Sequence, residues 1–149
     1  MPMRAHENIE VFYKKPPTYN PQMTHGHKRK VAKNQYVREA NGDSCYGREV
    51  RNTFYDSTDR YPLDVQVFSN AEQSNKIHNT QKPVEIYRYF MRTYTNEWET
   101  VLDFSAGSMT CAIAGIEENR KVICIEKDEE IFELGRNRVM EYLQERGNV

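Results

Sequence analysis

Two short apolar runs decide the fold of this 149-residue chain: Thr100-Val-Leu-Asp-Phe104 and Lys121-Val-Ile-Cys-Ile-Glu126. Each has the length of a strand. The second is nearly continuous in apolar residues, which is typical of a parallel strand buried on both faces. Between them, the turn Ala106–Met109 leads into a predicted helix of small residues from Thr110 to about Glu117. Strand, helix and strand in this order predict a βαβ unit.

Amphipathic helices flank this unit on both sides. A helix over residues 82–95 is predicted from apolar residues at helical spacing, namely Val84, Tyr87, Met91 and Tyr94. A second helix is expected to begin after the N-cap Asp128 and to continue to about Glu145. Its apolar face comprises Ile131, Phe132, Val139, Tyr142 and Leu143. The predicted fold class is therefore α/β, with part of a doubly wound parallel sheet.

The first half of the chain is less regular. Ile9–Tyr13 is predicted to be a strand that Pro16 and Pro17 end, and residues 63–68 alternate like a second strand. Residues 14–62 show no sustained period, so we expect short strands or a mobile, partner-binding insertion there. We divide the chain into a variable, basic segment at 1–75 and a βαβ lobe at 76–149.

Charge is distributed unevenly along the chain, although the net charge is only −1. Residues 1–62 hold 11 Lys+Arg against 7 Asp+Glu, whereas residues 63–149 hold 10 against 15. From Lys14 to Lys33 there are six basic residues and no acidic one. Such a block is either a phosphate-facing surface or a solvated loop.

Cysteine use and hydropathy exclude several classes of protein. Three cysteines without C-x-x-C spacing fit a reducing, cytoplasmic environment and neither a disulfide framework nor a zinc site. His25-Gly-His27 has no further ligand at suitable spacing, so no metal is expected. No apolar run approaches the roughly 18 residues of a membrane span, and no secretory signal is present.

The ligand site is expected beyond the carboxyl ends of the two strands. Gly107 allows close backbone approach in the turn after the first strand. Glu126 ends the second strand 23 residues after Asp103, where a carboxylate can accept from both hydroxyls of a ribose. The chain has neither Gly-x-Gly-x-x-Gly nor a phosphate-loop lysine, so an adenosine ligand without phosphates is favoured. S-adenosylmethionine therefore fits better than NAD.

Several motifs resemble those of one enzyme family. They are His78-Asn-Thr-Gln-Lys-Pro-Val-Glu85, Tyr94-Thr-Asn-Glu97, Val101-Leu-Asp103, Gly107-Ser108 and Ile125-Glu-Lys-Asp128. Together they resemble the C-terminal lobe of prokaryotic and phage DNA methyltransferases that modify adenine N6 or cytosine N4. Residues 78–140 carry most of the likeness, and residues 6–15 and 17–22 also resemble the family. Overall likeness favours adenine N6.

This resemblance implies a partial Rossmann-like methyltransferase fold, S-adenosylmethionine as methyl donor and a base flipped out of double-stranded DNA. It also implies a restriction–modification context. The implied cofactor-binding residues are Thr80, Gln81, Lys82, Asp103, Phe104, Ser105, Ala106, Gly107, Ser108 and Glu126, with the Lys82 ammonium suited to the methionine carboxylate. The implied nucleic-acid contacts are Lys14, Lys15, Lys28, Arg29, Lys30 and Lys33.

The chain departs from the family pattern in three places. Asn79 replaces a proline, and Met109 stands where the family usually has the second glycine of Gly-Ser-Gly. If that position needs φ > 0 or lies against the cofactor, the methionine would strain the loop or crowd the site. The catalytic motif (Asp/Asn/Ser)-Pro-Pro-(Tyr/Phe/Trp) is missing, because the Pro16-Pro17 pair has neither flanking residue.

We therefore assign no catalytic residue and expect the chain to be inactive alone, as a fragment or as one subunit beside a second chain that supplies the catalytic half. Two alternatives stay open at this point. The chain could be a non-catalytic nucleic-acid-binding module, or a structural half that complements a partner chain.

Overall fold

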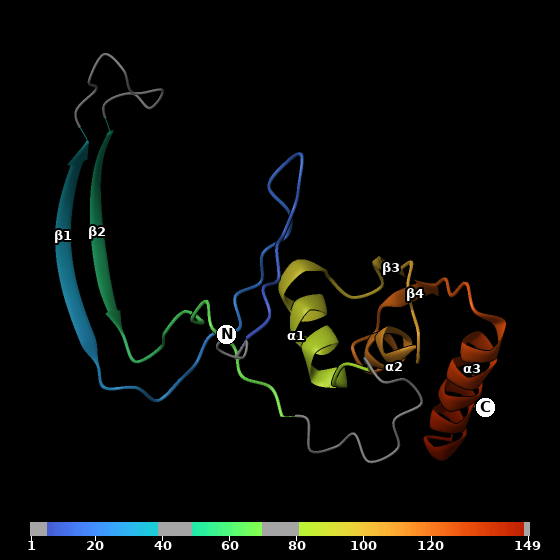
Figure 1. The fold of residues 1–149 in the computed structure, drawn as a ribbon. Helices are drawn as coiled ribbons and strands as arrows, with labels where there is room; N and C mark the ends of the chain where they lie inside the picture. The colour runs from blue at the N-terminus through green and yellow to red at the C-terminus, as the bar shows by residue number, and fades with distance from the viewer. Residues whose placement is uncertain (1–5, 39–48, 70–80, 148–149) are drawn as a thin grey trace, which may run out of the picture. The chain divides into compact units, whose positions relative to one another are not determined.

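The computed structural model describes residues 6–38, 49–69 and 81–147 (Figure 1). They belong to two compact units, one of residues 1–20 with 67–149 and one of residues 21–66. We call the first the βαβ lobe and the second the hairpin unit. Residues 6–20 thus belong with the lobe, and the division of functions between 1–75 and 76–149 stays a prediction.

The βαβ lobe has the predicted element order, and this confirms the α/β class. Its two strands are parallel, with Val101 opposite Val122, and a helix connects them (Figure 1). The elements are α1 (Val84–Tyr94), β3 (Thr100–Asp103), α2 (Thr110–Glu117), β4 (Lys121–Cys124) and α3 (Glu129–Glu145). These five elements are confirmed to within two residues of their predicted ends.

Capping and core packing explain these boundaries. The Asp128 carboxylate accepts from the Ile131 N–H at 3.0 Å and so caps α3. The lobe's core consists of Met91, Cys111 and Ala114, against which Val84, Tyr87, Val101 and Val122 pack. Helices α1 and α2 therefore cover one face of the β3–β4 sheet.

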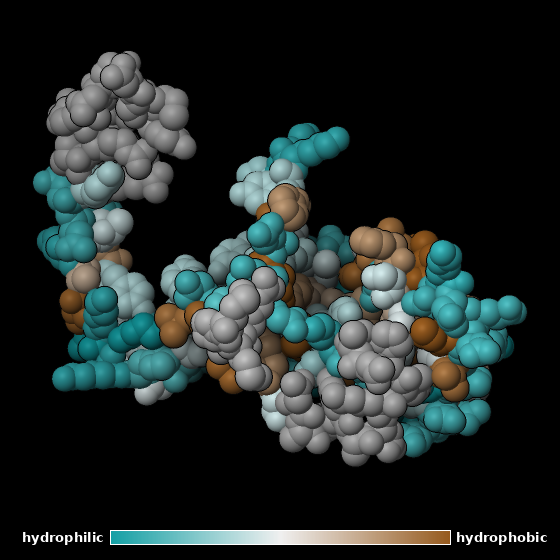
Figure 2. All heavy atoms as spheres, viewed as in Figure 1, coloured by the Kyte–Doolittle hydropathy of each residue, from teal (hydrophilic) through white to brown (hydrophobic). Residues whose placement is uncertain are grey.

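The other face of this sheet is bare within the described residues. Leu102, Phe104, Ile123 and Ile125 are 56%, 77%, 53% and 51% exposed. Figure 2 shows apolar surface, in brown, where Figure 1 places β3 and β4. The prediction that residues 121–126 are buried on both faces is therefore wrong, because no described element covers the face opposite α1 and α2.

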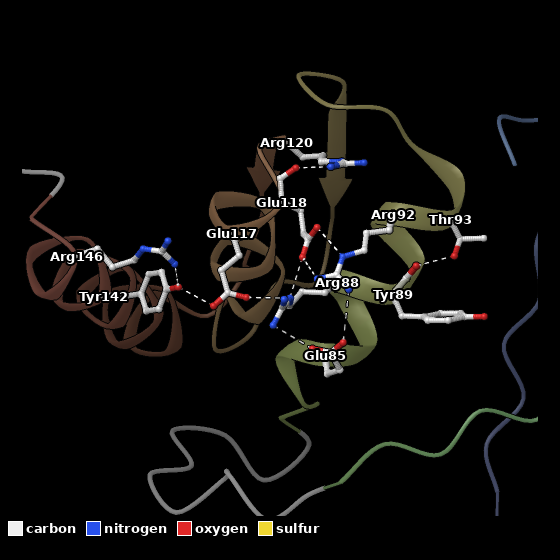
Figure 3. A network of polar contacts seen from close by, with 10 residues as sticks. All are labelled: Glu85, Arg88, Tyr89, Arg92, Thr93, Glu117, Glu118, Arg120, Tyr142 and Arg146. Atoms are coloured by element: carbon white, nitrogen blue, oxygen red, sulfur yellow. Dashed lines mark hydrogen bonds and ion pairs between the residues drawn. The ribbon is translucent and has the colours of Figure 1, made fainter. Parts of the chain in front are cut away.

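An ion-pair network joins α1 to the end of α2 (Figure 3). The Glu118 carboxylate is 11% exposed and accepts from Arg88 Nε at 2.8 Å and Arg92 Nε at 2.7 Å. Tyr142 of α3 donates to Glu117 at 2.6 Å. These contacts join α1 and α3 to the C-terminal end of α2.

The hairpin unit contains two antiparallel strands, β1 (Lys30–Arg38) and β2 (Glu49–Ser57), paired from Lys30–Ser57 to Arg38–Glu49. Arg60 ties their base together, because its guanidinium donates to the carbonyls of Lys28 at 2.6 Å and Ser57 at 3.2 Å. The expectation of short strands within residues 14–62 is thus confirmed.

Two predicted strands are not strands. Ile9–Tyr13 and residues 63–68 have no ladder partner in the part of the chain that the structure describes, and Phe12 and Val67 are 86% and 91% exposed. Alternating apolar residues favour a strand only where a neighbouring strand edge exists. Pro16 and Pro17 consequently end no strand. None of the described helices is long and apolar enough to cross a membrane.

Candidate functional site

The loop from Phe104 to Met109 joins β3 to α2 at the carboxyl end of the sheet. Hydrogen bonds extend the strand pairing into it, since Ile125 N donates to Asp103 O at 2.8 Å and Ala106 N to Ile125 O at 3.0 Å. Gly107 has φ +50°, a left-handed conformation that glycine adopts without strain. The loop therefore turns tightly beside the end of β4.

Glu126 fixes this loop from the other strand. Its Oε2 accepts from the Gly107 N–H at 2.8 Å, and its Oε1 accepts from the N–H groups of Lys127 at 2.9 Å and Asp128 at 3.1 Å. Three backbone donors thus orient one carboxylate. The two features that the sequence singled out, Gly107 and Glu126, are in direct contact.

A cavity of ≈ 310 Å³ lies at this point. It is lined by Gln81, Lys82, Tyr87, Ser105, Ala106, Gly107, Ser108, Thr110, Glu126 and Ile131. Seven of the ten predicted cofactor residues are therefore brought together here. Among the described residues no cluster of His, Cys, Asp and Glu of the kind that holds a metal ion is present.

Three predicted cofactor residues are not among the lining residues. Thr80 lies outside the described residues. Phe104 is on the bare face of the sheet. Asp103 accepts from the Ser105 N–H at 3.2 Å through Oδ1, while its buried Oδ2 has no hydrogen-bond partner among the described residues. The roles of all ten residues toward a cofactor stay predictions.

Asp103 lines a second, apolar cavity of ≈ 410 Å³ between α1 and β3. Its other lining residues are mostly aliphatic and aromatic and include Phe90, Leu102 and Cys111. An unsatisfied carboxylate oxygen in such surroundings is costly unless a donor reaches it. The second cavity is therefore a place where a further polar group would stabilise the lobe.

Sequence reasoning missed Tyr87, Thr110 and Ile131 as lining residues. The helical spacing predicts only that Tyr87 lies on the apolar face of α1. Burial, with the nearby Asp103 charge adding to it, raises the pKa of Tyr87 to about 12, so the phenol stays neutral. The amphipathic pattern could have found Tyr87, because it also placed Tyr87 on the face toward the sheet.

Lys82 carries a contact that the sequence did not predict. Its ammonium lies 2.6 and 2.8 Å from the two carboxylate oxygens of Glu7. Both side chains are exposed, at 42% and 76%. Glu7 therefore holds Lys82 in the same kind of contact that a ligand carboxylate would make.

Met109 has φ 53° and ψ 33°, which is the left-handed conformation considered for this position. Its side chain packs against α3, since a Cβ at Gly135 would lie 2.9 Å from Met109 Cγ. Met109 does not line the cavity, so it strains the backbone without crowding the site.

Arg138 of α3 supports the same loop. Its Nη1 donates to Ser108 O at 2.8 Å and to Thr110 Oγ1 at 3.0 Å. Burial lowers the pKa of Arg138. Gly135 and Arg138 of α3 thus both contact this loop.

The six predicted nucleic-acid contacts are all exposed and are divided between the two units. Lys14 and Lys15 belong to the lobe, and the other four belong to the hairpin unit. Arg29 forms a bidentate ion pair with Asp56, with both N–O distances 2.7 Å. This contact raises the pKa of Arg29 and lowers that of Asp56.

Comparison with protein families gives one match that covers most of the chain. Residues 2–137 match the N6_N4_Mtase family, described as DNA methylase. The chain belongs to this family. S-adenosylmethionine is the family's methyl donor, and the resemblance stated from the motifs is confirmed.

One similar solved structure is described as the crystal structure of an M1.HpyAVI-SAM complex. The identity is 23% and the TM-score 0.42, and the likeness covers 71% of this chain and 44% of that chain. This chain thus aligns with less than half the length of that methylase. Among curated proteins no match was found.

Proposed function

We propose that this chain is the S-adenosylmethionine-binding part of a DNA amino-methyltransferase, with adenine N6 favoured over cytosine N4. The observation that carries the proposal is the cavity where three backbone N–H groups hold Glu126 beside Gly107. Its volume of ≈ 310 Å³ lies at the lower end of the roughly 300–1,000 Å³ of ligand pockets. S-adenosylmethionine would supply an electrophilic methyl group there.

The chain's own residues would bind and orient the cofactor. Glu126, already oriented by the backbone, would accept from the ribose hydroxyls. Lys82 would release Glu7 and bind the methionine carboxylate in its place. Gly107 would allow the adenosine close to the loop backbone, because no Cβ intervenes. Arg138 would position this loop through Ser108 O.

Methyl transfer also needs a segment with the motif (Asp/Asn/Ser)-Pro-Pro-(Tyr/Phe/Trp), because that motif binds the target amine in this family. We propose that a polypeptide with this motif, in the same protein or in a partner chain, covers the bare face of the sheet. The half-exposed side chains of Leu102, Ile123 and Ile125 support this, since large apolar faces of parallel sheets are normally covered.

Calorimetric titration with S-adenosylmethionine tests the cofactor part. We expect saturable binding that Glu126→Gln weakens at least about tenfold, because two charge-assisted bonds to ribose are lost. Glu130→Gln is the matched control, since Glu130 lies exposed in the first turn of α3. No heat up to millimolar cofactor, in a sample with a native circular dichroism spectrum, would contradict the proposal.

Incorporation of tritiated methyl groups into unmethylated DNA tests the proposal that the chain needs a further polypeptide for methyl transfer. The chain alone should transfer none, and addition of a polypeptide with the catalytic motif should restore transfer. Transfer by the purified chain alone would contradict this part.

A nucleic-acid-binding module that lacks the cofactor is the second candidate, and the Lys82–Glu7 ion pair and the strained Met109 favour it. DNA binding without any cofactor binding would decide for it. The cytoplasmic location and the restriction–modification context stay predictions.

A further inference from the structure

The hairpin unit presents a two-stranded ribbon with little burial on either side. The described side chains of β1 and β2 are exposed except those of Ala32, Tyr55 and Ser57, which are half-buried. An isolated two-stranded hairpin is only marginally stable in water. Here its base is fastened by the Arg60 contacts and by the Arg29–Asp56 ion pair. Both faces of the ribbon beyond this base are thus available to a partner.

The two faces differ in how their polar groups are used. Side chains alternate along a strand, so Lys33 and Gln35 share a face with their cross-strand partners Phe54 and Asn52. We call these four residues the amide face. Within the described residues no hydrogen bond engages the side-chain amides of Gln35 and Asn52.

The opposite face is committed to contacts within the hairpin unit. Thr53 Oγ1 donates to Asn34 O at 3.3 Å, and Tyr55 OH donates to Asp59 O. Arg60 Nη1 in turn donates to Tyr55 OH at 3.1 Å. Asn34 is the exception on this face, because no hydrogen bond among the described residues engages its side-chain amide. The amide face is the one with two such amides, at Gln35 and Asn52.

We propose that the amide face enters the major groove of duplex DNA and that Gln35 and Asn52 read the edge of adenine. The major groove is about 12 Å wide and admits a two-stranded ribbon. An Asn or Gln amide pairs with adenine N6 and N7 through one donor and one acceptor. The inference rests on the proposed function, which makes DNA the substrate, and it adds the surface that selects the sequence.

The neighbours of the two amides fit the same partner. Phe54 is 69% exposed on the amide face, where an aromatic ring can contact the thymine methyl of an A·T pair. Lys33, its cross-strand partner, places a cation at the same level of the ribbon. Lys28 and Lys30 lie exposed at the base, where they would contact phosphates and fix the register. Arg29 should contribute less, because Asp56 already neutralises it.

Selection of bound duplexes from a randomised library tests the inference on the full chain. The wild type should prefer an A·T pair at one or two positions. Gln35→Ala and Asn52→Ala should each reduce that preference about tenfold while non-specific affinity changes little. Asn34→Ala is the matched control, one residue away on the opposite face, and should keep the preference. Lys30→Ala should instead weaken binding to all sequences and reduce the salt slope by about one.

Two results would overturn the inference. One is a base preference that survives in both Gln35→Ala and Asn52→Ala, and the other is a preference that Asn34→Ala abolishes equally. DNA binding itself, and with it the proposed function, would still stand in either case. No DNA binding by a chain that binds S-adenosylmethionine would contradict both this inference and the DNA part of the proposed function. Sequence-selective binding through the amide face without cofactor binding would support the inference and contradict the cofactor part alone.

Discussion

The βαβ lobe and the hairpin unit are stabilised by different kinds of contact. The lobe has a small core of Met91, Cys111 and Ala114, with an ion-pair network behind it. In the hairpin unit none of the described residues is buried, and its strands depend on their ladder and on contacts at their base. The lobe is therefore shaped before a ligand arrives, whereas the hairpin has its faces left for a partner. Substitutions should therefore affect stability mainly in the lobe.

The largest effect is expected for Gly115→Ala. A Cβ at this position would lie 2.1 Å from Val122 Cγ2, so α2 and β4 would have to separate. We expect a loss of roughly 1–3 kcal/mol of unfolding free energy from overpacking, in spite of the better helix propensity of alanine. Urea denaturation followed by the fluorescence of Trp98, the single tryptophan, measures it. The double variant with Val122→Ala should be more stable than the sum of the single effects allows, and simple additivity would contradict the packing argument.

Glu118→Gln should have the next largest effect. The hydrogen bond from Arg92 is the main cause that lowers the pKa of Glu118 below its ordinary value of 4.5, with the bond from Arg88 adding to it and burial opposing it. The stability from this shift is present above pH 4.5 and is lost as the pH falls through the folded-state pKa. We expect the variant to lose about 1–2 kcal/mol of unfolding free energy at pH 7. The expected loss is smaller than for a fully buried ion pair, because the two arginines are one-third exposed and solvent screens the interaction.

The pH dependence provides the control for this prediction. The difference in unfolding free energy between wild type and Glu118→Gln should shrink as the pH falls through the lowered folded-state pKa of Glu118, because the carboxyl then becomes neutral like the amide. A difference that stays constant while this carboxyl is protonated would show that its charge contributes nothing.

A smaller effect is expected for Glu7→Gln. The substitution frees the Lys82 ammonium for a ligand carboxylate, so the affinity for S-adenosylmethionine should rise by at most about fivefold, as is typical of exposed ion pairs. Glu10→Gln, an exposed position three residues away, should leave the affinity unchanged. Weaker binding in Glu7→Gln than in Glu10→Gln would mean that Glu7 supports the site instead of competing for Lys82.

The smallest effect on stability is expected for Phe54→Ala in the hairpin unit. This side chain is 69% exposed, so its removal should change the unfolding free energy by no more than about 0.5 kcal/mol. The same urea titration should detect no shift of the lobe's transition. A clear destabilisation of the lobe would show that the two units are coupled and do not unfold independently.

The sequence predicted the lobe well because burial leaves a periodic pattern. The helices of residues 84–94 and 129–145 and both parallel strands follow from apolar spacing, and Asp128 marks a helix start. The contact between Gly107 and Glu126 also follows, because parallel strands bring their carboxyl ends together. The seven cofactor candidates that line one cavity are those that the family resemblance implies, and of these Gly107 and Glu126 also follow from the strand geometry.

The remaining features could not be predicted, and each has a physical reason. The strands β1 and β2 have both faces exposed, so no alternation marks them. Ile9–Tyr13 has the composition of a strand but no ladder partner among the described residues. The Lys82–Glu7 contact joins residues 75 positions apart, and no local pattern encodes such a pair.

A two-dimensional amide NMR spectrum of the isotopically labelled chain, titrated with S-adenosylmethionine, shows whether the cofactor binds beside Glu126. The Gly107 N–H donates to Glu126, and those of Lys127 and Asp128 share the same carboxylate, so all three should report ribose binding. We expect saturable shifts at these amides and at Lys82, with the amides of β1 and β2 unchanged. Shifts confined to the hairpin unit, or no shifts at millimolar cofactor, would contradict this expectation.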